Sequence, residues 1–279
     1  MFPELMGVLD ELSAQQLVSP LEEIATGALS FGPEDEWREW FHYLLPRLIP
    51  RAHERFVHQV LELLATALFA FYPDGLEAGP YRQFREDVLA TLGRCPMDSA
   101  CWPDGLLDVE RVLNPTRVPS IGLWGWDEPK GPLSASMFLC LKYLRPSDIN
   151  GWLASVFQID EPHWRAGVMA WLLGAHEVLK GLVLHPCKFD RCYPPIDWDW
   201  SHALTGSYLD VDGSERFRGD FIPKPNRDAA LAAVRDYFDE KIMLEWIESL
   251  AREPEVAAAT DALPLWLLQA YKPNDLAGS

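Results

Sequence analysis

The chain has 279 residues, and its 42 acidic against 24 basic residues give a formal net charge of −18. A field of that sign repels nucleic-acid backbones and anionic membranes, so neither is expected as a partner, whereas basic proteins are attracted. With 48% hydrophobic and 24% charged residues, the composition is that of a folded globular protein rather than a disordered one.

Helix start signals recur along the whole chain, and strand patterns are scarce. Ser19 ahead of Pro20 predicts one helix start, and Pro33, which is followed by three acids, predicts the next. Pro46 predicts a break before a long helix over 51–72. Further helices are predicted at 80–93, 106–113, 133–145, 147–158, 161–184, 226–252 (capped by Asn226) and 254–272.

Two long segments, 114–132 and 186–225, interrupt the predicted helices. Loops of this length in a folded domain are usually functional. We find no clear interdomain linker, and the chain has the length of one large domain or two small ones. We therefore expect an all-α, multi-helix α-hairpin or solenoid-like single domain over 1–279 with two long loops, in which any division lies near 114–132.

The start of the chain and its cysteines are typical of a cytoplasmic protein. The first five residues contain one acid, Glu4, and no base, where a signal peptide would be basic. The longest apolar stretch, 60–72, is too short to span a bilayer and contains Glu62. Five cysteines, an odd number, indicate reduced thiols. We expect a cytoplasmic location without membrane contact.

The strongest candidate for a binding site is the loop from 197 to 220, where acids alternate with aromatic side chains. No helix start accounts for its central acids, so a helix dipole does not explain them. Aromatic side chains among acids suit a Lys- or Arg-rich partner through burial, cation–π contact and charge, although ordinary packing of the aromatics is the alternative. The residues predicted to contact a basic protein here are Trp198, Asp199, Trp200, Tyr208, Asp210 and Asp212.

A second acidic cluster is formed by Glu34, Asp35 and Glu36, in the first turn of a predicted helix. One interpretation is that it docks the same basic partner. The other is local, because a carboxylate in a first helical turn gains about 0.3–1 kcal/mol from the helix dipole. The local interpretation is favoured, and the cluster stays a candidate contact.

His185, Cys187, Cys192 and His202 are the best metal-ligand candidates, but they lack the two paired ligand sets of a zinc site. The Asp-x-Asp pattern ahead of Gly213 does not form a calcium loop, because the glycine falls at the fourth position instead of the sixth. No metal or other cofactor is therefore expected.

The chain contains no nucleophile-elbow, phosphate-loop or zinc-protease motif. His176 and Glu177 lie in an apolar helical run and would suit a general base, although a core histidine with satisfied hydrogen bonds is commoner. We expect a protein-binding module and not an enzyme. It would capture and neutralise a basic partner, most concretely as an immunity or antitoxin protein that inhibits a toxin enzyme. Two alternatives stay open: a helical hydrolase that uses His176 and Glu177 or a metal at 185–202, and a helical scaffold or regulator in a larger complex.

Overall fold

The computed structural model describes residues 5, 7–8, 11–12, 14–30, 33–48, 55–113, 131–205 and 220–272. Within these ranges the chain forms thirteen α-helices and no strand, which confirms the all-α prediction. In the same ranges, no helix is both long and apolar enough to cross a bilayer. The α-helices are α1 (Ala14–Ser30), α2 (Glu34–Leu48), α3 (Arg55–Phe71), α4 (Phe84–Thr91), α5 (Val109–Val112), α6 (Pro132–Tyr143), α7 (Pro146–Phe157), α8 (Pro162–Leu179), α9 (Ser201–Thr205), α10 (Lys224–Tyr237), α11 (Glu240–Leu250), α12 (Pro254–Ala259) and α13 (Leu263–Tyr271).

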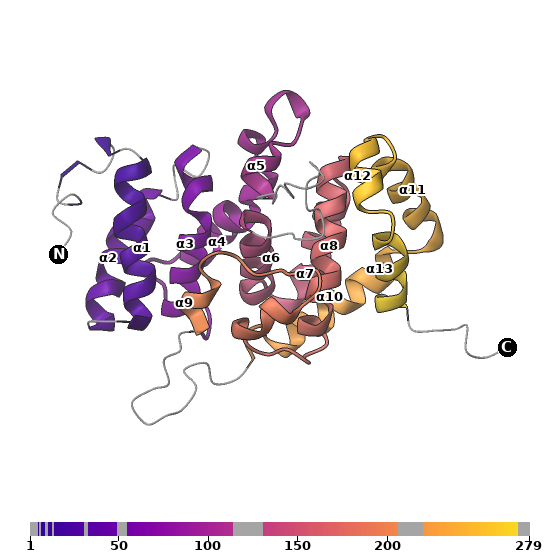
Figure 1. The fold of residues 1–279 in the computed structure, drawn as a ribbon. Helices are drawn as coiled ribbons and strands as arrows, with labels where there is room; N and C mark the ends of the chain where they lie inside the picture. The colour runs from indigo at the N-terminus through magenta and orange to yellow at the C-terminus, as the bar shows by residue number, and fades with distance from the viewer. Residues whose placement is uncertain are drawn as a thin grey trace.

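The helices stand side by side in an elongated row, with α1 and α2 at one end and α11 to α13 at the other (Figure 1). Helix α3 packs against α1 on one side and α6 on the other, and both α11 and α13 pack against α8. The row is solenoid-like, but the order of the chain is broken once. After α8 the chain runs back to place α9 against α3 and α1, and α10 then packs against α7 and α8.

This returning segment is the predicted second loop, and it is partly helical. It contains the 3-10 helix η7 (Pro186–Arg191) and α9, while 206–219 lies outside the described residues. Most of the first predicted loop, 114–130, lies outside them as well. Aromatic contacts pack this segment against the row of helices. The rings of Phe138 and Phe189 stack with their centroids 4.8 Å apart, and those of Phe69 and Phe221 lie 5.0 Å apart.

Two proline signals are overridden by packing. Helix α2 begins directly after Pro33 as predicted, but α1 begins at Ala14 and runs through Pro20. Leu17 and Leu21, on either side of Pro20, are both buried, so continuing the helix keeps one apolar face against the core. Pro46 likewise lies inside α2 instead of ending it.

The predicted helix over 226–252 is two helices, because Asp239 starts a new one. Its carboxylate accepts a hydrogen bond from the backbone N–H of Ile242 at 2.8 Å, which caps α11. Asn226 does not cap α10. Its amide instead donates to the carbonyls of Leu141 at 2.6 Å and Leu144 at 2.9 Å, at the end of α6. The predicted helix over 254–272 is likewise divided, into α12 and α13.

Candidate functional site

Trp198 lies in the core, which corrects its assignment as a partner anchor. Its side chain is 1% exposed, and its ring lies 5.7 Å from those of Phe69 and Phe138. Its indole N–H donates a hydrogen bond to the hydroxyl of Thr66 at 3.0 Å. A buried indole needs such a partner. The side chain therefore joins the returning segment to α3 and offers no surface to another protein.

Asp199 is exposed and forms an acidic group with Glu62 of α3. The backbone N–H of Asp199 donates to Glu62 Oε2 at 3.0 Å. Burial, followed by the negative charges of Asp199 and Asp197, raises the pKa of Glu62 to about 7, against the opposite effect of that hydrogen bond. Glu62, which the sequence did not single out, therefore exchanges a proton near neutral pH.

The other predicted contacts of this loop are only partly placed by the structure. Trp200 is half-buried and packs against the core. Tyr208, Asp210 and Asp212 lie outside the described residues, so their role stays a prediction.

The three acids of α2 lie where a helix dipole stabilises them. Glu34, Asp35 and Glu36 occupy its first turn, and the side chains of Asp35 and Glu36 are exposed, whereas that of Glu34 lies outside the described part. Both interpretations of this cluster, the local one and partner docking, remain compatible with this placement.

The metal candidates are not assembled into a site in the part of the chain that is described. There, no group of three or more His, Cys, Asp or Glu side chains could hold a metal ion. Cys187 is exposed and Cys192 is buried. Burial raises the pKa of Cys192 to about 12, which favours the thiol over the thiolate that binds metals. His185 lies just before η7, and the side chain of His202 lies outside the described residues.

His176 takes part in the packing of α8 against α13. Its ring meets that of Tyr271 edge-on at a centroid distance of 4.9 Å, while Glu177, the other half of the suggested pair, is exposed. Burial, together with the charge of Lys180, lowers the pKa of His176. The Tyr271 hydroxyl in turn donates to the carbonyl of Leu172 at 2.7 Å.

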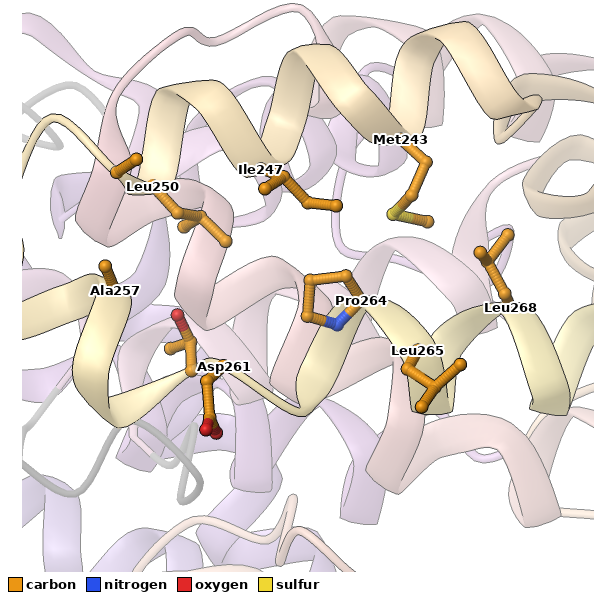
Figure 2. Close-up of a pocket in the computed structure, with 10 residues that line it drawn as sticks. Met243, Ile247, Leu250, Ala257, Asp261, Pro264, Leu265 and Leu268 are labelled. Carbon is orange, nitrogen blue, oxygen red and sulfur yellow. The ribbon is translucent and has the colours of Figure 1, made fainter.

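An apolar groove of about 470 Å³ lies between α11 on one side and α12 and α13 on the other. In Figure 2, Met243, Ile247 and Leu250 of α11 face Pro264 of α13 across the opening. This volume falls in the range of sites that bind small molecules. The ten described residues that line it are Met243, Ile247, Leu250, Ala251, Ala257, Thr260, Asp261, Pro264, Leu265 and Leu268.

The groove stays open because α11 and α13 are each fastened to α8. Tyr271 ties α13 to α8 through its hydroxyl. For α11, the Arg165 guanidinium of α8 lies 5.1 Å from the centre of the Trp246 ring and pairs with Asp160 at 3.0 Å. Arg252, just after α11, pairs with the same carboxylate at 2.5 Å. These contacts set the positions of both walls independently of anything that fills the space between them.

Exposed apolar side chains gather on and beside these walls. Nine large apolar side chains are exposed in the described part of the chain, and five of them belong to this end of the row or touch it. Patches of this kind mark interaction surfaces more often than isolated apolar residues do. The five are Leu244 (55% exposed), Ile247 (41%), Leu265 (58%), Trp266 (40%) and Tyr193 (65%), whose ring lies 6.3 Å from that of Trp266.

The sequence contained a signal for this groove that our reasoning missed. In the sequence of α11, Ile242 and Trp246 are four residues apart and share one face of the helix, whereas Leu244 and Ile247 lie off that face. A surface helix needs one apolar stripe, so additional large apolar residues beside it indicate a second contact. The run 263–268 in α13 is almost entirely apolar and carries the same signal.

Comparison with known proteins gives no relative: no family model, no curated protein and no solved structure matches the chain.

Proposed function

We propose that the chain is a protein-binding module that captures a basic protein partner at the groove between α11 and α13. The observation that carries this proposal is the groove itself, an apolar cavity of about 470 Å³ with fixed walls and exposed apolar neighbours. Burial of those side chains by a partner would supply affinity. The net charge of −18 would select a basic partner and speed its approach.

The acids on and beside the groove fit this proposal as steering charges. Asp261 lines the groove and is exposed, and Glu248 of α11 and Glu255 of α12 are exposed as well. Exposed charges of this kind act mainly on the rate of association and are screened by salt within about 8–10 Å. In this proposal the groove holds the partner, and the acidic surface accelerates the encounter.

A narrower form of the proposal is a cytoplasmic immunity or antitoxin protein whose partner is a toxin enzyme such as a nuclease. The excess of acidic residues supports this narrower proposal, because proteins that bind phosphate backbones carry basic surfaces. An acidic protein that covers such a surface would neutralise the enzyme.

The test is site-specific photo-crosslinking in the native cells. A photoreactive residue replaces Leu265 in the groove, and in a matched experiment it replaces Leu182, which is 70% exposed and does not line the groove. We expect a discrete cross-linked product from position 265 that contains a basic protein, and no such product from position 182. An acidic protein at position 265, the same product from both positions, or no product would contradict the proposal.

A further inference from the structure

We infer that the occupant of the groove is an amphipathic helix of the partner, with Lys or Arg on the flanks of its apolar face. This inference rests on the proposed function and specifies what the partner brings to the site. Its basis is the position of the groove in the row of helices, the chemistry of its walls and the charge around it.

The groove is about as long as two turns of a helix. Two of the helices that line it, α11 and α13, lie at the end of the row (Figure 1), and both pack on α8. The wall formed by α11 runs from Met243 to Leu250, which is about two helical turns. A helix that packs there presents residues at i, i+3, i+4 and i+7 over the same length.

The walls favour a helix over an extended peptide. An extended segment brings unpaired backbone N–H and C=O groups, which are costly to bury without partners. Of the ten described lining residues, only Thr260 and Asp261 have polar side chains, and the Thr260 hydroxyl already donates to the carbonyl of Val256 at 2.7 Å. A helix satisfies its own backbone and can bury a fully apolar face here.

The negative charge around the groove favours a partner helix with basic residues on its flanks. Between 240 and 271 the sequence has six acidic and two basic residues. Both bases are engaged: Lys241 lies 3.5 Å from Glu245, and Arg252 lies 2.5 Å from Asp160. Asp261 lines the groove and is exposed. A second copy of the chain is a poor occupant, because each copy carries a net charge of −18.

The experiment selects helices for the groove without knowledge of the partner. A displayed library of peptides of about 18 residues, or five helical turns, carries apolar residues at i, i+3, i+4 and i+7 and random residues on both flanks. It is selected on the full chain and counter-selected on the Leu265→Asp variant. Selected peptides are then synthesised with a fluorescent label, and their affinities are measured by anisotropy. The matched control protein is Leu182→Asp, which places the same charge at another exposed leucine.

We expect the selected peptides to be enriched in Lys and Arg on their flanks. Their affinity should fall about tenfold or more for Leu265→Asp, stay within about twofold for Leu182→Asp, and weaken severalfold for Asp261→Lys. Exchanging the flanking Lys for Glu in the peptide should also cost about tenfold or more. Peptides that bind equally well with Glu flanks, or equally well to Leu265→Asp, would overturn the inference.

Other occupants give distinguishable results. A dimer in sedimentation equilibrium that is lost in Leu265→Asp would assign the groove to a second copy. Peptide binding that requires deletion of 273–279 would assign it to the chain's own end. Either result overturns the partner-helix inference. If position 265 cross-links a basic protein but no helix is selected, the proposed function stands and this inference fails; if neither is found, both fail.

Discussion

The indole N–H of Trp198 donates to the hydroxyl of Thr66, and that hydroxyl donates at 2.8 Å to the carbonyl of Glu62 one turn earlier in α3. These two hydrogen bonds join the returning segment to α3 through a buried side chain. The next residue, Asp199, adds a third bond to the same turn through its backbone N–H. Directly before α9, Ile196 and Trp198 are therefore part of the packed core, whereas Asp199 is exposed and Trp200 is half-buried.

Trp198→Ala should lower the free energy of unfolding by about 3–5 kcal/mol, the usual cost of truncating a fully buried aromatic side chain. Trp266→Ala is the control. Because Trp266 is 40% exposed, this substitution should lower the free energy of unfolding by at most about 1 kcal/mol. Urea unfolding followed by circular dichroism measures both. Equal losses for the two variants would show that Trp198 is not buried as described.

Glu62 should make stability depend on pH near neutrality. The pKa of Glu62 is raised in the folded chain from 4.5 to about 7, so the folded state holds this proton more tightly than the unfolded state. The contribution of this proton to the free energy of unfolding is fully present below pH 4.5. It declines as the pH rises from 4.5 to 7 and is lost above pH 7.

Glu62→Gln should therefore be more stable than the natural chain at pH 8, by up to about 3 kcal/mol, and similar to it at pH 4. The difference in the free energy of unfolding between the two proteins, measured in urea across this range, checks the sign. A Glu62→Gln variant that is less stable at pH 8 would contradict the raised pKa.

The five cysteines should differ sharply in reactivity. Cys187 is exposed, whereas the other four are buried. Burial raises the pKa of Cys101, Cys140 and Cys192 to about 12. A thiol reagent at pH 8 should modify one cysteine rapidly in the folded chain and all five in urea. Cys187→Ser should abolish the rapid reaction, and rapid modification of two or more thiols would contradict the described burial.

Local signals in the sequence were enough to predict most of the helices. A proline at or near the first helical position, as at Pro132, Pro146 and Pro162, acts within one turn and needs no knowledge of the fold. The errors arise where distant contacts decide. Asn226 caps α6 and not its own helix because the carbonyls of Leu141 and Leu144 lie beside it in the folded chain.

The candidate site was less predictable, because it depends on which surfaces meet. The burial of Trp198 is set by Thr66, which is 132 residues away in the sequence. The acidic pattern around Trp198 could not reveal this contact. The groove depends on the separation of α11 and α13, which is fixed by their separate attachments to α8 through Arg165 and Tyr271. The excess of apolar residues in these helices indicates a contact, but not a groove.

The most direct test is to purify the partner identified by cross-linking and to measure its dissociation constant. The measurement is made at one salt concentration for the natural chain, for Leu265→Asp and for Leu182→Asp. Both leucines are exposed, so neither substitution should change the midpoint of unfolding. The account predicts that Leu265→Asp weakens binding by about 30-fold or more, as expected for an interface hot spot, and that Leu182→Asp stays within about twofold. Binding to Leu265→Asp that is as tight as to the natural chain would contradict it.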